Sequence, residues 1–372
     1  MAVTRSHSLS IGIVGLPNSG KSTIFNALTH SVVPAENYPF CTIDKNVGVV
    51  KIPDERLKRL ASHLKAKNVV PAAMTFVDIA GLVKGASKGE GLGNQFLAHI
   101  READAIMYML RAFKSESVAH VYGEINPVED LEIVRSELIL KDMETLEKKL
   151  RELHNKAKAG ITDEIKMQVK TLEDVRKAMN DGRPAYEVKL SEEAEKFLWE
   201  MWLLTDKPSF YILNVMGGVE EPDLVRWIDS LKGKIADDEE NFMMTVDCKM
   251  EGEMEGLPES EREELIGMVE NYHSVDNIIS LAYRRLDLIT FYTGNEKEAN
   301  AWSIARGATV KEAAGVIHSD LEENFVVAEV VNVDKMIEAG GWVAAREKGL
   351  IESHGKEYVV QDGDYVNVLV NK

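Results

Sequence analysis

Short apolar runs recur along two parts of the chain, up to residue 110 and again between residues 208 and 246. Their length and their content of Val, Ile and Phe predict buried strands rather than helices. After the first run, Ile24, Phe25 and Leu28 recur at helical spacing over residues 23–29, which predicts a helix. Strands that alternate with helices predict an α/β fold with a mostly parallel sheet. The expected strands are 9–14, 47–50, 74–77, 103–110, 208–213 and 242–246.

Between residues 129 and 205 the pattern changes to long amphipathic helices. One apolar seam steps by three or four residues and ends before Gly160. Thr162 then fits a helix N-cap with an acidic first turn after it, and a second seam begins. Two such seams predict an antiparallel helical hairpin inserted into the α/β domain. The seams consist of Ile139, Met143, Leu146, Leu150 and Leu153, and of Ile165, Val169, Leu172, Val175 and Met179.

A basic run on the first of these helices has two interpretations. Charged residues on a helix usually form a solvated face, and the alternative is a docking surface for an acidic partner. The run consists of Lys148, Lys149, Arg151, Lys156 and Lys158.

The composition changes again near residue 287. Runs typical of strands at 325–333 and 358–360, with a turn at 361–364, predict a small α+β domain. This part holds fifteen Asp or Glu and eight Lys or Arg, a net charge of −7, so RNA contact here would rely on shape or stacking. We therefore expect an α/β domain over 1–128 and 206–286, a hairpin domain over 129–205 and a C-terminal domain over 287–372.

Composition limits the class of protein. At 372 residues, with 45% apolar and 28% charged residues, the chain can form two or three globular domains. The net charge of −18 argues against a large basic surface for nucleic acid. No apolar run approaches the roughly 18 residues of a membrane helix. The two cysteines, Cys41 and Cys248, form no C-x-x-C pair, as expected in a reducing compartment. We expect a soluble, cytoplasmic monomer.

The loop after the first strand carries the strongest chemical signal. Residues 15–22, Gly-Leu-Pro-Asn-Ser-Gly-Lys-Ser, fit the P-loop pattern G-x-x-x-x-G-K-S/T between a strand and a helix. Backbone N–H groups and the helix N-terminus can enclose phosphate oxygens there. Lys21 would reach the β- and γ-phosphates, and the Ser22 hydroxyl would ligate Mg²⁺. A glycine-rich turn without a ligand is the alternative. The pattern predicts a nucleotide-binding protein.

A second signal follows the strand at 74–77. Asp78 and Gly81 form a D-x-x-G tetrapeptide, in which the carboxylate reaches Mg²⁺ through water and the glycine N–H senses the γ-phosphate. Five glycines then fall between residues 81 and 93. This segment is either a plain flexible loop or a switch that becomes ordered around the γ-phosphate.

Two later strands end where a guanine-nucleotide-type fold places its base-reading motifs. Asn214 stands at the position of N-K-x-D, and Asp247-Cys248-Lys249 stands at the position of S-A-K. The acidic fourth residue of N-K-x-D is replaced by Gly217, so a carboxylate partner for guanine is missing.

The order of these motifs resembles the Obg-like ATPases, or YchF family. The resemblance covers nearly the whole chain, and the last matching stretches are similar to the TGS domain, a small β-grasp-like domain, of that family. Ser19 stands where the family usually has valine, and Gly217 where it often has an acidic residue. The matching stretches are 12–23, 37–43, 78–86, 91–94, 301–304, 313–315 and 358–364.

The resemblance implies ATP in preference to GTP, slow hydrolysis with Mg²⁺, and association with ribosomes or other translation components. Carried over by position, Thr42 joins Ser22 as a Mg²⁺ ligand, and Asn214 with the Val215 backbone meets adenine. Cys248 belongs to the same base-binding group. Asn18, Ser19, Gly20, Lys21, Ser22 and Thr23 hold the phosphates.

Two residues are expected to be catalytic, Lys21 in the P-loop and His120, to which the resemblance points. In Ras-like enzymes a glutamine after D-x-x-G orients the attacking water, but Leu82 follows Gly81 here and cannot hydrogen-bond. An imidazole can orient water or accept a proton near neutral pH. A histidine that merely packs beside a strand is the alternative.

Three functions therefore remain open. The first is an ATPase that acts as a conformational switch on a large ribonucleoprotein. The second is a nucleotide-sensing adaptor whose hydrolysis is negligible, and the third is an ordinary GTPase.

Overall fold

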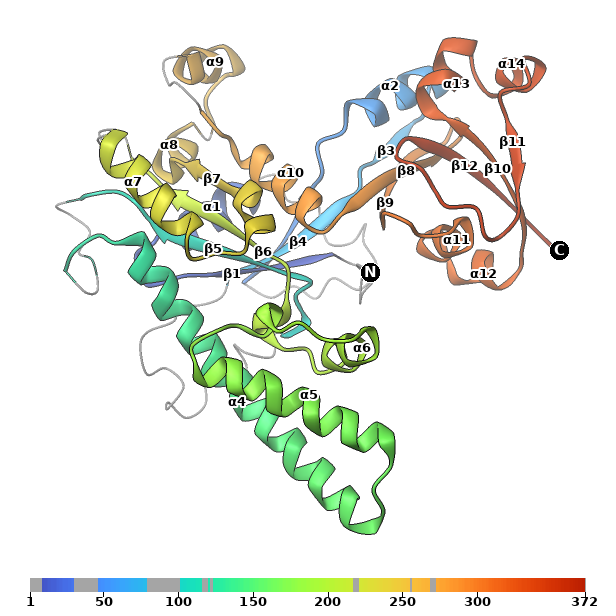
Figure 1. Cartoon of the computed structure of the whole chain (residues 1–372). Helices are drawn as coiled ribbons and strands as arrows, with labels where there is room; N and C mark the ends of the chain where they lie inside the picture. Colours follow the sequence, from blue (N-terminus) through green and yellow to red (C-terminus); the bar gives the residue numbers. More distant parts are fainter. Residues whose placement is uncertain are drawn as a thin grey trace.

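A computed structural model describes residues 9–29, 46–78, 101–115, 120, 123–216, 221–254, 256–267 and 272–371. The chain forms a central α/β domain, a long helical hairpin that projects from it, and a smaller C-terminal domain on another side (Figure 1). The predicted fold class is confirmed. None of the described helices is both long enough and apolar enough to cross a lipid bilayer.

The central domain is built on a six-stranded sheet in the order β2-β4-β1-β5-β6-β7. β2 runs antiparallel to β4, and the other neighbours are parallel. All five residues 106–110 within β5 are buried, which explains why this strand is an unbroken apolar run in the sequence. The strands are β1 Ser10–Val14, β2 Val47–Lys51, β4 Ala73–Asp78, β5 Ala105–Arg111, β6 Ser209–Asn214 and β7 Met243–Val246.

Helices cover both faces of this sheet. Buried residues of α1, α8 and α10 share one apolar core with one face, and buried residues of α4 and α7 share a second core with the other. This two-layer cover is what a parallel sheet with two buried faces requires. The helices of the central domain are α1 Lys21–Thr29, α4 Pro127–Ala159, α7 Glu221–Lys232, α8 Cys248–Glu253, α9 Glu259–Gly267 and α10 Val275–Arg285.

The predicted hairpin is present and is formed by α4 and α5 (Asp163–Asn180), which lie side by side (Figure 1). Thr162 caps α5 as predicted, because its side chain accepts a hydrogen bond from the Ile165 backbone N–H. The two seams form one core together with α6 (Glu192–Trp199) and the short 3₁₀ helix η3 (Ala185–Glu187). Ile165, at the distal end, is the one seam residue that this core leaves out within the described chain.

The C-terminal domain contains a second six-stranded sheet, in the order β11-β10-β12-β8-β9-β3. α11 packs on one face, and α13 and α14 contribute to the core on the other. β3 comes from the N-terminal part of the chain and pairs in parallel with β9. The elements are β3 Asn68–Val70, β8 Leu288–Gly294, β9 Glu298–Ala305, β10 Phe325–Asn332, β11 Glu352–His354, β12 Asp364–Val370, α11 Val310–Ile317, α12 Ser319–Glu323, α13 Val333–Ala339 and α14 Trp342–Glu347.

One predicted strand is wrong. Residues 358–360 form no strand, and only an isolated bridge joins Val359 to Thr309. The Val360 side chain is buried in the domain core while Val359 is exposed. Burial in a loop therefore produced the apolar pattern that resembled a strand.

A buried carboxylate ties α4 of the hairpin to the short 3₁₀ helix at 204–206, which precedes β6. Asp142 of α4 is fully buried and accepts hydrogen bonds from the backbone N–H groups of Leu204 and Thr205, at 2.8 and 2.7 Å, and from the Thr205 hydroxyl. Burial raises the pKa of Asp142 from 3.8 to about 6, although all three donors act in the opposite direction.

We predict that, at about pH 4.5, Asp142→Ala lowers the free energy of unfolding by about 3 kcal/mol, because two buried backbone N–H groups lose their acceptor. Since the folded-state pKa of Asp142 lies above the unfolded value, its stabilising contribution is largest below about pH 4 and is lost as the pH rises through about 6. Chemical denaturation at about pH 4.5 and 7 measures both effects. Glu144→Ala, an exposed neighbour on the same helix, is the control. Equal stability of the two variants at about pH 4.5 would contradict the role of Asp142.

Candidate functional site

The loop between β1 and α1 has the backbone geometry of a phosphate-binding loop. Asn18 and Gly20 have positive φ values of 64° and 102°. A side chain at Gly15 would collide with the Met109 carbonyl oxygen, and one at Gly20 with the Asn214 amide. Glycine is therefore required at both positions, which allows the loop to lie directly on β5 and β6.

Lys21 is buried at the start of α1, beneath this loop. Its Nζ donates hydrogen bonds to the carbonyl oxygens of Gly15 at 3.1 Å and Leu16 at 2.8 Å. Burial lowers the pKa of Lys21 to about 8, and the nearby Asp78 acts in the opposite direction. A bound polyphosphate would add negative charge and favour the ammonium form. The residue is thus positioned for an anion at the helix N-terminus.

Ser22 and Asp78 bring together the loop and the end of β4. The Ser22 hydroxyl donates to Asp78 Oδ2 at 3.0 Å. Within the described part of the chain, Asp78 Oδ1 and the Ser19 hydroxyl are buried without a hydrogen-bond partner. A hydroxyl and a carboxylate are suitable oxygen ligands for Mg²⁺, which usually takes only one or two protein groups and completes its shell with phosphate and water. These residues therefore fit the predicted magnesium site.

Asn214, at the end of β6, connects three loops of the site. Its Nδ2 donates to the Ser19 carbonyl at 2.9 Å, and its Oδ1 accepts from the Cys248 backbone N–H at 3.2 Å. The Val215 N–H donates to the Val246 carbonyl at 2.9 Å. The Cys248 side chain is buried in the apolar core, and this burial raises the pKa of the thiol. The sequence did not reveal this bracing role, because it depends on contacts between distant loops.

Comparisons with known proteins find similarity along nearly the whole chain. Residues 10–146 match a family profile described as a 50S ribosome-binding GTPase, and residues 288–371 match the profile of the YchF GTPase C-terminal domain, described as a protein of unknown function. The ribosome-binding ATPase YchF of Bacillus subtilis is 42% identical over 369 residues, which cover 98% of this chain and 100% of that protein. The chain belongs to the YchF family of Obg-like ATPases.

Two further relatives extend this result. Obg-like ATPase 1 of Caenorhabditis elegans is 38% identical, over 96% of this chain and 91% of that protein. The solved structure of the Schizosaccharomyces pombe YchF GTPase has a TM-score of 0.82 at 36% identity and covers 98% of both chains. The resemblance found in the sequence is confirmed.

In this YchF-family chain His120 lies against the start of α4. Its Nε2 is 3.2 Å from the Asp130 carboxylate, and both side chains are buried. His120 lines a cleft of about 850 Å³ together with Arg111 and Trp227. The described lining of this cleft includes no residue of the loop 15–23. The structure places the His120 side chain against Asp130, and its catalytic role stays a prediction.

Two predicted site residues, Thr42 and Gly81, lie outside the described residues. The sequence did not identify Asp130 as the partner of His120. In the sequence, Asp130 is one of two acidic residues in the first turn of a long helix. Its acidic first-turn position was a general helix signal and gave no indication of a histidine partner.

Proposed function

We propose that this chain is a nucleotide-dependent switch that binds Mg²⁺ and ATP, hydrolyses ATP slowly to ADP and phosphate, and associates with ribosomes in the cytoplasm. The observation that carries the proposal is the Ser22–Asp78 contact, which joins the phosphate-binding loop to the end of β4 at a buried lysine. Relatives named ribosome-binding ATPases support the ribosomal partner.

Different residues of the site would bind the phosphates, hold the metal and orient the attacking water. Backbone N–H groups of the loop and Lys21 bind the phosphates, and Ser22 with Asp78 and Thr42 would hold Mg²⁺. When bound, the metal neutralises charge on the β- and γ-phosphate oxygens. Leu82 offers no hydrogen bond to the attacking water, so we propose that His120 supplies this contact and that turnover is slow without a partner.

ATP is the proposed substrate because the chain lacks a carboxylate for guanine at position 217. A site without that acceptor leaves the guanine donors unpaired, which costs roughly 1–3 kcal/mol. In competition binding, ATP should therefore bind at least as tightly as GTP, and Gly217→Asp should shift the preference towards GTP. A clear wild-type preference for GTP would favour the GTPase alternative.

The distal half of the hairpin is the proposed ribosomal contact. Residues 148–170 hold seven Lys or Arg and three Asp or Glu on a chain whose net charge is −18. Lys148 and Arg151 are exposed, and Ile161 at the tip is 64% exposed. A basic, exposed tip is suited to RNA phosphates.

Reversing Lys148, Lys149 and Arg151 to Glu should weaken ribosome co-sedimentation at least about tenfold and leave ATP affinity unchanged. The control reverses three lysines near the base of the hairpin, Lys177, Lys189 and Lys196, and changes the net charge equally. Co-sedimentation is compared in ATP, ADP and no nucleotide. Equal loss in both variants would mean that overall charge, rather than the tip, controls association.

A further inference from the structure

The segment between β2 and β4 leaves the nucleotide-binding sheet and enters the C-terminal domain. It forms α2 (Glu55–Leu64) and then β3, which pairs with β9 from Asn68↔Glu298 to Val70↔Asn300. In Figure 1, α2 lies beside α13, at the edge of the C-terminal domain. We call residues 52–72 the arm. The C-terminal domain therefore has two attachments, this arm and the direct connection from α10 to β8.

Apolar contacts make the arm part of a continuous core. Leu57 and Leu60 of α2 are buried in the same cluster as Met336 of α13 and Tyr365 of β12. That cluster extends to Ile11 in β1 of the central sheet. Because close-packed side chains transmit displacement, the arm and both domains are mechanically connected.

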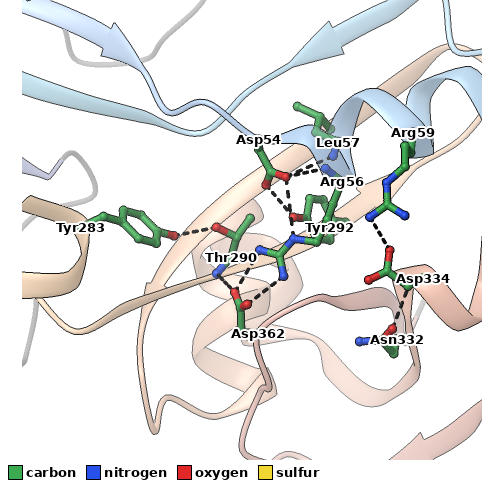
Figure 2. Close-up of polar contacts among 10 residues, drawn as sticks. All are labelled: Asp54, Arg56, Leu57, Arg59, Tyr283, Thr290, Tyr292, Asn332, Asp334 and Asp362. Carbon is green, nitrogen blue, oxygen red and sulfur yellow. Dashed lines mark hydrogen bonds and ion pairs between the residues drawn. The ribbon is translucent and has the colours of Figure 1, made fainter. Parts of the chain in front are cut away.

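Polar contacts lock the first turn of α2 to the C-terminal domain, as Figure 2 shows. Asp54 caps α2 through the Arg56 and Leu57 N–H groups, and its other oxygen accepts a hydrogen bond from the Tyr292 hydroxyl at 2.5 Å. Arg56 binds Asp362 through two nitrogens, at 2.7 and 3.2 Å. We call the Asp54–Tyr292 and Arg56–Asp362 contacts the lock.

The lock has a fixed geometry. The Arg56 guanidinium lies 5.5 Å from the centre of the Tyr292 ring, and Asp362 also accepts from the Thr290 N–H at 3.0 Å. Burial alone would raise the pKa of Asp362, but the hydrogen bonds from Arg56 and Thr290 lower it, so the carboxylate stays charged. Paired donors and a stacked ring restrict the angle between α2 and β8. A second ion pair, Arg59–Asp334, lies one turn further along α2.

The other end of the arm leads to the nucleotide site. β2 and β4 pair from Val47↔Val77 to Lys51↔Ala73, and β4 ends at Asp78, which contacts Ser22. A shift of this strand pair on nucleotide binding would be carried directly into the arm. We propose that the arm and its lock couple the Asp78 end of β4 to the C-terminal domain. Nucleotide binding would then change the orientation of that domain relative to the central sheet. This inference rests on the proposed nucleotide binding.

The test measures hydrogen exchange of the C-terminal domain with and without Mg²⁺ and a non-hydrolysable ATP analogue. In the wild type, exchange in β9 and β3 should change at least about threefold on binding. The variant Arg56→Ala/Tyr292→Phe removes both contacts of the lock, but keeps the apolar face of α2 and the β3–β9 pairing. It should bind the analogue with wild-type affinity, but hydrogen exchange in β9 and β3 should no longer change on binding.

The matched control is Lys58→Ala, since Lys58 lies on α2 and its exposed ion pair is with Glu55 of the same helix. This variant should behave as the wild type, and Tyr292→Phe alone should show a partial loss. Calorimetry separates the two proposals. No analogue binding by the wild type would overturn the proposed function, and with it this inference. The coupling alone would be overturned if the wild type bound the analogue without a change in hydrogen exchange. It would also be overturned if the Arg56→Ala/Tyr292→Phe variant kept the full change.

Discussion

Lys21→Ala should abolish ATP binding, with an affinity loss of at least about 100-fold, while the chain keeps its fold. Lys21 provides the buried ammonium of the phosphate-binding loop, and charge-assisted contacts to phosphate are among the strongest hydrogen bonds. In the free protein this ammonium donates hydrogen bonds to two loop carbonyl oxygens and is desolvated, so its removal costs little stability. Calorimetry on the folded variant, checked by circular dichroism, measures the effect.

Lys51→Ala, which removes an exposed lysine at the end of β2, is the control for loss of one positive charge. The pH dependence gives a second check. Because burial lowers the pKa of Lys21 to about 8, the ammonium is lost as the pH rises through that value, and ATP affinity should fall between about pH 7 and 9. Unchanged ATP affinity in Lys21→Ala would remove the lysine from the site.

His120→Ala should lower the single-turnover rate of ATP hydrolysis at least about tenfold and leave ATP affinity nearly unchanged. The magnitude is within the range for a group that orients water or transfers a proton. In the structure His120 contacts Asp130, and the prediction requires that the imidazole reach the attacking water when nucleotide is bound. Single-turnover hydrolysis with saturating enzyme measures the chemical step without product release.

His154→Ala, at an exposed position on the hairpin, is the matched control and should hydrolyse ATP at the wild-type rate. Leu82→Gln should not simply raise the rate, because the surrounding segment would have to aim the new side chain. Wild-type hydrolysis in His120→Ala would leave a group supplied by a partner as the remaining candidate.

Local patterns in the sequence predicted the elements whose causes are local. The apolar run of β5 and the stepped seams of α4 and α5 each depend on which face a residue buries, and this is visible in the spacing. The phosphate-binding loop could be predicted equally well, because its glycines and Lys21 are required at fixed positions. For the same reason the capping role of Thr162 could be predicted from its neighbours alone.

Features that depend on distant contacts could not be predicted in this way. β3 has only three residues, two of them exposed, and its strand conformation depends on pairing with β9, more than 200 residues away. The bracing of the site by Asn214 and the His120–Asp130 contact likewise join separate segments. The strand predicted at 358–360 was wrong for a different reason. Val360 is buried in a loop, and the resulting apolar run resembled the local pattern of a strand.

Single-turnover hydrolysis of ATP, measured with and without ribosomes, tests the central claim most directly. A ribosome-linked ATPase switch predicts slow hydrolysis by the protein alone and a rate at least about tenfold higher with ribosomes, with Lys21→Ala inactive in both conditions. Equal rates with and without ribosomes, while ATP and ribosomes both still bind, would contradict the switch and favour the nucleotide-sensing adaptor.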